Sequence, residues 1–240
     1  SSNQNQTITV ENIGTVRAIY IDNAILDDIG QLSNTLNLAK ENHFNAIILD
    51  FKTREGVLNY DSNLLSYSGQ KDINEIDINL VNRIKNEGFL VVGRIYCFED
   101  TIAPQRLSAY IYEDVEKTQI WFDAPAILEG KVWLDPTNQR ATQYLTSVVN
   151  EVVALGADCI YLDSVQFPES RVGAVPVYTE DDTTLNRNLV LMNFIEDAVK
   201  AANGRPVILG APLEGIDGGN TEKWGGTLSL DEKVKNHTKT

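Results

Sequence analysis

An aspartate at the end of an apolar segment is the first candidate for chemistry in this chain. Residues 158–162 read Asp-Cys-Ile-Tyr-Leu, and Asp163 follows them directly, ahead of a short turn that Pro168 closes. Such a run predicts a buried parallel strand that places one carboxylate at its carboxyl end. Parallel α/β barrels carry out their chemistry at that end. Asp163 is therefore the leading candidate for a catalytic carboxylate, and capping of the following loop is the alternative.

Further polar side chains come at or just after the ends of other apolar segments. We expect them to meet Asp163 at one edge of a sheet. This group consists of Asp22, Asp50, Lys52, Tyr60, Arg94, Tyr96, Asp135, Gln166 and Glu214.

One arginine lies inside an apolar segment, which is unusual. Arg94 interrupts the run of residues 89–98, and an unpaired buried guanidinium would be costly. We therefore expect it to pair with a carboxylate, with Asp50 favoured over Asp135 and Asp163. Asp50 and Lys52 lie two residues apart in a predicted strand, so we expect both side chains on one face.

The elements that must position these groups alternate along the chain. Six apolar segments predict strands, and amphipathic segments between them predict helices. Right-handed crossovers turn such an order into a parallel sheet. The fold class is therefore α/β, a TIM-barrel-like parallel (β/α) sheet that is incomplete after the sixth strand. The predicted strands are residues 16–21, 46–52, 89–98, 131–135, 158–163 and 206–211.

The two ends of the chain carry weaker patterns. Residues 1–15 predict a flexible lead, and residues 16–240 a single barrel-like domain. Residues 228–235 predict a short helix, and no seventh or eighth strand is evident. The polar beginning lacks an initiating methionine and resembles a processed chain, which leads us to expect an extracellular or cell-surface location.

Charge and composition narrow the partners. The net charge of −14 and the pI of about 4.5 argue against nucleic acid. No apolar run approaches the ~20 residues that a membrane-spanning helix requires.

Cys97 and Cys159 lie in apolar segments and predict buried thiols, and no spacing predicts a metal site or another cofactor. Neither histidine stands near a predicted strand end, which disfavours Ser/His/Asp catalysis. The oligomeric state is left open.

An ordered set of motifs resembles a known bacterial family. The motifs are residues 16–20, 45–52, 57–62, 92–100, 132–138 and 163–168. Their order and spacing are similar to those of DUF4015, a family regarded as glycoside hydrolases with a TIM-barrel domain. The resemblance implies a barrel acting on a polysaccharide or oligosaccharide. Ser164 and Gln166 depart from it, since the family usually has an aromatic residue and an arginine there.

Glycoside hydrolysis requires two carboxyl groups, about 5–5.5 Å apart for retention and about 6.5–9.5 Å for inversion. Asp163 is the candidate nucleophile or base, and Glu214 the candidate acid. Asp135, Asp50 and Asp22 are alternative carboxylates. Arg94 would keep the aspartate ionised. We expect the remaining polar side chains, Lys52, Tyr60, Tyr96 and Gln166, to contact sugar hydroxyls.

Two other functions remain open. The chain could be a carbohydrate-binding relative that kept the barrel and lost turnover, which the replacement at Gln166 favours. It could also be another α/β enzyme in which the acids at the strand ends hold a divalent cation.

Overall fold

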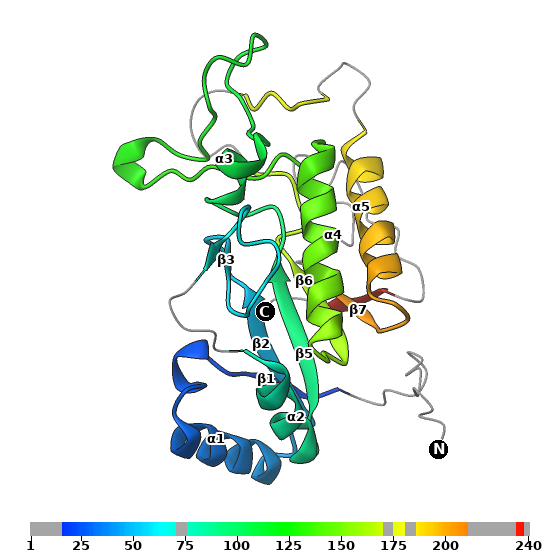
Figure 1. Ribbon diagram of the computed structural model, residues 1–240. Coiled ribbons are helices and arrows are strands. Elements are labelled where there is room, and N and C mark those ends of the chain that lie inside the picture. Colours follow the sequence, from blue (N-terminus) through cyan, green and yellow to red (C-terminus); the bar gives the residue numbers. More distant parts are fainter. Residues whose placement is uncertain (1–15, 71–75, 170–174, 181–185, 211–233, 238–240) are drawn as a thin grey trace.

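Parallel strands form one curved sheet along the described part of the chain, with helices packed against its outer face (Figure 1). The computed structural model describes residues 16–70, 76–169, 175–180, 186–210 and 234–237. Across the sheet the parallel strands run in the order β1, β2, β5, β6, β7 and β8. Their bounds are Ala18–Tyr20, Ala46–Lys52, Leu90–Tyr96, Cys159–Asp163, Val207–Gly210 and Val234–His237. The predicted α/β class with a barrel-like parallel sheet is confirmed.

Two short strands extend the sheet beside the end of β2. These are β3 (Val57–Leu58), antiparallel to β2, and β4 (Gly69–Gln70), parallel to β3. They belong to the small excursion that separates β2 from α2.

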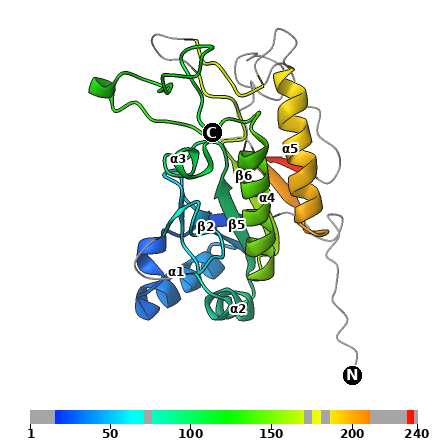
Figure 2. The same ribbon diagram turned by 45° about the horizontal axis from the view of Figure 1, so that its top comes forward.

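The helices connect successive strands and mostly begin at a capping side chain. They are α1 (Ile29–Glu41), α2 (Ile78–Asn86), α3 (Ala103–Leu107), α4 (Gln139–Ala154) and α5 (Arg187–Ala201), with 3-10 turns at Asn23–Ile25 and Ala126–Leu128. Side chains of Asp28, Asp77, Asn138 and Asn186 accept backbone N–H groups in the first turns of α1, α2, α4 and α5. Figure 2 shows α4 and α5 side by side.

Alternation along the strands separates two faces. Residues such as Ile47, Val91 and Ile160 join one large core with the helices. Gly93 allows α4 to approach closely, because a Cβ at Gly93 would lie 2.5 Å from Cγ1 of Val152. The opposite, concave face carries a smaller apolar cluster of Ala46, Val92, Cys159 and Tyr161. Cys97 and Cys159 are buried free thiols, as predicted.

The predicted strand at residues 131–135 is wrong. β5 already pairs with β2 along one edge and with β6 along the other, so no strand lies between them. Instead, Leu134 makes an isolated antiparallel bridge with Tyr110, and its N–H donates to the carbonyl of Phe98. Trp133 and Leu134 of this segment are buried in the connection between β5 and α4.

The prediction for the end of the chain also needs correction. Residues 234–237 form β8, which pairs in parallel with β7 from Val207↔Val234 to Gly210↔His237, and not the end of a helix. The sheet thus continues beyond the sixth predicted segment. Residues 228–233 lie outside the described part of the chain.

Candidate active site

Asp50 and Arg94 form a two-pronged ion pair on the concave face. They are register partners on β2 and β5. The Nε of Arg94 donates to Oδ1 of Asp50, and its Nη2 donates to Oδ2 at 2.8 Å. The hydroxyl of Tyr20 donates to the same Oδ2 at 3.1 Å. The predicted pairing of Arg94 with Asp50 is confirmed.

Aromatic rings enclose this ion pair. The guanidinium of Arg94 lies 4.5 Å from the ring centroid of Tyr20 and 5.0 Å from that of Tyr96. Burial disfavours the charged form of Arg94, but the hydrogen bonds to Asp50 and the negative charge of Asp50 outweigh this effect. The pKa of Arg94 is therefore raised. Burial and the charge of Asp50 raise the pKa of Tyr20 to about 12. The tyrosines therefore stay neutral around a permanent cation.

Two asparagines fix the backbone beneath the pair. The side-chain amides of Asn23 and Asn59 both donate to the carbonyl oxygen of Asp50, at 2.9 Å and 2.8 Å. Both asparagines are buried. They hold the end of β2 in place, so the Asp50 carboxylate has a fixed position on the concave face.

Asp163 ends β6 beside Tyr96, its register partner on β5. Its Oδ1 accepts the N–H of Ser164 at 2.7 Å, and the side chain is almost fully buried. Ser164 adopts a left-handed backbone conformation, with a φ of 53°. That conformation turns the chain sharply immediately after the catalytic candidate.

The turn at Ser164 brings a second carboxyl group close to Asp163. The Ser164 hydroxyl lies 3.2 Å from Oε2 of Glu99 and 3.5 Å from Oδ1 of Asp163. It can donate to either carboxylate. Glu99 and Asp163 therefore lie on two sides of one hydroxyl, at the carboxyl ends of neighbouring strands.

Burial raises the pKa of Glu99 above its ordinary value of 4.5. Arg54 opposes this rise, since its Nε lies 3.3 Å from Oε2 of Glu99, and the negative charge of Asp163 adds to the rise. Arg54 also lies 5.3 Å from the centroid of the Tyr96 ring. A carboxyl with a raised pKa beside a second carboxylate is the combination that acid–base catalysis uses.

Lys52 is not on the face predicted for it. The pairing of β2 with β5 shifts between Asp50 and Lys52, where Phe51 is the extra residue of a bulge. The bulge turns Lys52 into the core, where its ammonium pairs with Asp100 at 2.8 Å and donates to the carbonyl of Tyr96. Because both charged side chains are fully buried, Lys52 cannot contact a sugar in this conformation.

Tyr60 and Asp135 are also away from any exposed surface. Tyr60 is fully buried, and its hydroxyl donates to Oε2 of Glu151 on α4, behind the sheet. Asp135 is fully buried too and accepts hydrogen bonds from Thr137 and, at 2.5 Å, from the N–H of Thr179. Both residues stabilise connections around the site.

The remaining predicted residues have mixed positions. Asp22 is exposed and accepts the N–H of Ala24, which caps a 3-10 turn. Gln166 is half-buried in the loop after β6. Glu214 lies outside the described residues, so its predicted role as the acid stays a prediction.

Sequence reasoning missed Glu99 and Tyr161. Glu99 falls in one of the family-like motifs, but it comes three residues after the end of β5. The candidates were chosen from residues at the strand ends, so Glu99 was not among them. Tyr161 on β6 is the register partner of Arg94 on β5. Its hydroxyl lies over Gly210 of β7, where a Cβ would be 2.8 Å from the hydroxyl oxygen. Alternation from Asp163 would have placed Tyr161 on the concave face.

Among the residues that the structure describes, no group of three or more His, Cys, Asp or Glu side chains is arranged to hold a metal ion. No helix among these residues is long and apolar enough to cross a membrane.

Solved structures share this fold at low sequence identity. A hypothetical protein from Ruminiclostridium thermocellum matches with a TM-score of 0.67 at 20% identity, covering 80% of this chain and 96% of that one. The glycoside hydrolase domain of PgaB (BpsB) from Bordetella bronchiseptica matches with a TM-score of 0.60 at 12% identity, covering 90% and 70%. The α-galactosidase TtGalA from Thermus thermophilus matches with a TM-score of 0.53 at 13% identity, covering 81% of this chain and 37% of the galactosidase. A search of curated proteins gave no match.

The curved parallel sheet, with carboxylates at the carboxyl ends of its strands, places the protein among the barrel-like α/β folds. Residues 18–225 match DUF4015, described as a "Putative glycosyl hydrolase domain". The chain belongs to that family, and the resemblance seen in its motifs is confirmed.

Proposed function

We propose that the protein hydrolyses a glycosidic bond of a polysaccharide or oligosaccharide, with Asp163 and Glu99 as its two carboxyl groups. The observation that carries this proposal is the Ser164 hydroxyl, within 3.5 Å of both carboxylates at the ends of β5 and β6. Family membership supports the reaction class.

The two carboxyl groups take different roles because their surroundings differ. Glu99 has its pKa raised by burial, which favours the protonated form that a general acid needs. Asp163 accepts the backbone N–H of Ser164, a contact that suits a carboxylate acting as nucleophile or base. Glu99 therefore protonates the leaving oxygen, and Asp163 acts at the anomeric carbon or on the attacking water.

The concave face beside this pair suits a sugar ring. Tyr20 is 43% exposed there, and Tyr96 is half-buried beside Asp163. Exposed aromatic faces bury the apolar side of a sugar, and neighbouring polar groups bind its hydroxyls. Because Arg94 is held by Asp50 between the two rings, the whole surface is fixed before the substrate arrives.

The proposal is tested by assaying the unmutated protein, Asp163→Asn and Glu99→Gln on a panel of polysaccharides and aryl glycosides. We expect both variants to stay folded by circular dichroism and, on polysaccharides and on aryl glycosides with poor leaving groups, to lose at least ~100-fold in kcat. Glu55→Gln is the matched control, because Glu55 is an exposed carboxylate on the loop next to Arg54.

Each result decides between functions. Turnover that survives in Asp163→Asn would refute the assignment of the nucleophile or base. Binding of sugar without turnover by the unmutated protein would support the carbohydrate-binding relative instead.

A further inference from the structure

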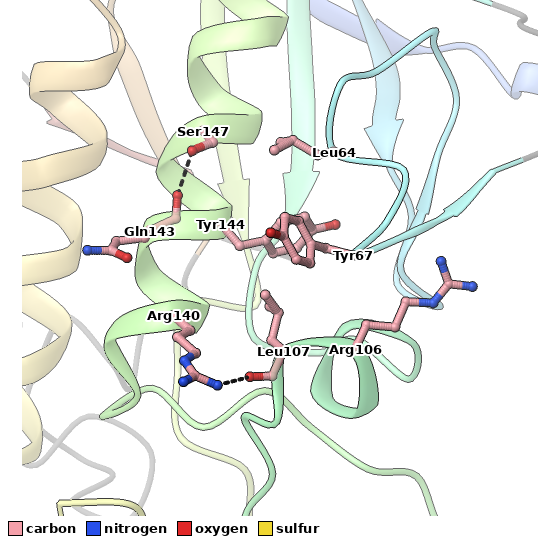
Figure 3. Close-up of a pocket in the computed structure, with 8 residues that line it drawn as sticks. All are labelled: Leu64, Tyr67, Arg106, Leu107, Arg140, Gln143, Tyr144 and Ser147. Atoms are coloured by element: carbon pink, nitrogen blue, oxygen red, sulfur yellow. Dashed lines mark hydrogen bonds between the residues drawn. The ribbon is translucent and has the colours of Figure 1, made fainter.

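A cavity lies between α3, α4 and the segment that follows β3. It has a volume of about 370 Å³, within the usual range of small-ligand pockets. Figure 3 shows Tyr67 and Tyr144 at its centre, Leu64 and Leu107 on either side of them, and Arg106 and Arg140 at two opposite ends. None of the groups proposed for catalysis lines this cavity.

The centre of the cavity is aromatic. The rings of Tyr67 and Tyr144 meet nearly edge-to-face, with centroids 6.3 Å apart. Tyr144 is almost fully buried beneath, whereas Tyr67 is 40% exposed. Such an open ring offers a flat surface on which a sugar ring can stack.

Both arginines are fixed in place but keep donors for a ligand. Nη1 of Arg106 donates to the carbonyls of Leu65 and Ser68, at 2.9 Å and 2.6 Å. Nη1 of Arg140 donates to the carbonyl of Leu107 at 3.3 Å. In each case these backbone bonds use one nitrogen of the planar guanidinium, so the other donors stay available.

The charge around the cavity is unusual for this chain. The protein carries a net charge of −14, yet no carboxylate stands among the described residues that line the cavity. Within the described ranges, neither Arg106 nor Arg140 forms an ion pair with an acidic side chain. Guanidinium groups without such partners favour a ligand that brings its own carboxylates.

We propose that this cavity binds an acidic oligosaccharide, a chain of pyranose rings bearing carboxylates. One ring stacks on Tyr67, and carboxylates of the chain pair with Arg106 and Arg140. The choice of a saccharide rests on the proposed function, whereas the negative charge of the ligand follows from the arginines alone.

The test uses the full chain carrying Asp163→Asn, so that binding is measured without cleavage. Isothermal titration compares an oligogalacturonate of about five sugars with a cello-oligosaccharide of the same length and with oligoglutamate. We expect oligogalacturonate to bind at least tenfold more tightly than either of the other two. Equal affinity for the neutral sugar, or for the acidic peptide, would overturn the proposal.

Variants then locate the binding. Arg106→Gln/Arg140→Gln and Tyr67→Ala should each weaken oligogalacturonate at least tenfold, whereas Tyr67→Phe should keep most of the affinity. Arg83→Gln is the matched control, since Arg83 also donates to a backbone carbonyl but lies on α2. If the glutamine pair unfolds, Arg106→Lys/Arg140→Lys keeps the charges and loses the forked geometry, and it should still bind several-fold more weakly. Unchanged affinity in folded arginine variants would contradict the site.

The result is separable from the outcome for catalysis. Binding that depends on Arg106 and Arg140, together with an unmutated protein that turns over no substrate of the panel, would support this cavity and refute the proposed hydrolysis.

Discussion

The hydroxyl of Ser164 lies 3.2 Å from Oε2 of Glu99, a residue 65 positions earlier in the chain. This contact joins the turn after β6 to the segment after β5. It brings Glu99 to the side of Asp163, which ends β6. A serine with a positive φ thus connects the two carboxyl groups on which the proposed mechanism depends.

The alkaline side of the pH–rate profile tests the role of Arg54. If Glu99 is the general acid, kcat/KM falls as the pH rises through its pKa, which burial places above 4.5. Arg54 favours the ionised form and lowers that pKa. Arg54→Gln should therefore move the alkaline limb to higher pH.

The shift should shrink in high salt, because the Arg54 side chain is 46% exposed. Arg17→Gln is the control, because Arg17 directly precedes β1 at the amino end of the sheet. It should leave the pH–rate profile unchanged. A limb that moves to lower pH in Arg54→Gln would contradict Glu99 as the acid.

The ion pair of Asp50 and Arg94 should contribute strongly to stability. Its side chains are only 12% and 17% exposed. Arg94→Ala leaves the Asp50 carboxylate without its partner, and we expect a loss of about 3–5 kcal/mol in the free energy of unfolding. Denaturant titration measures this loss.

A second variant separates the charge from the packing. Arg94→Met with Asp50→Asn removes both charges and should cost clearly less than the two single changes added together. Lys40→Ala is the control, since the Lys40–Glu87 pair is largely exposed and should leave the unfolding midpoint nearly unchanged. A midpoint for Arg94→Ala equal to that of the control would refute the account.

Lys52 should stabilise the fold without contacting substrate. Its ion pair with Asp100 is fully buried, and Asp100 also accepts the N–H groups of Ile102 and Ala103 at the start of α3. Lys52→Met should lower the free energy of unfolding by about 3–5 kcal/mol. At temperatures where the variant stays folded, KM should be close to that of the unmutated protein. A raised KM with full stability would instead restore Lys52 as a sugar ligand.

Much of the fold was predictable because apolar, β-branched segments between helical segments have few alternatives to parallel strands. Arg94 was predictable for a similar reason, since its burial required a carboxylate. The position of Lys52 was not predictable, because the bulge at Phe51 turns the side chain of Lys52 to the opposite face of the sheet. The run ending at Leu134 has the apolar character of a strand, but β5 and β6 leave it no edge.

Other parts carried too little signal. The β8 sequence Val-Lys-Asn-His has no apolar pattern and becomes a strand by pairing with β7. Glu99 approaches Asp163 through a left-handed turn at Ser164, a backbone conformation that residue types alone do not reveal. A bacterial origin and an extracellular location stay predictions.

Leaving-group dependence tests the central claim most directly. On an aryl glycoside with a poor leaving group, Glu99→Gln should lose at least ~100-fold in kcat/KM, because no acid protonates the departing oxygen. A dinitrophenyl glycoside of the same sugar needs no protonation of its leaving group, so Glu99→Gln should keep most of its kcat/KM on that substrate. Asp163→Asn should lose kcat/KM on both glycosides. Equal losses of Glu99→Gln on the two substrates, or full activity of Asp163→Asn on either, would contradict the assignment of Glu99 and Asp163.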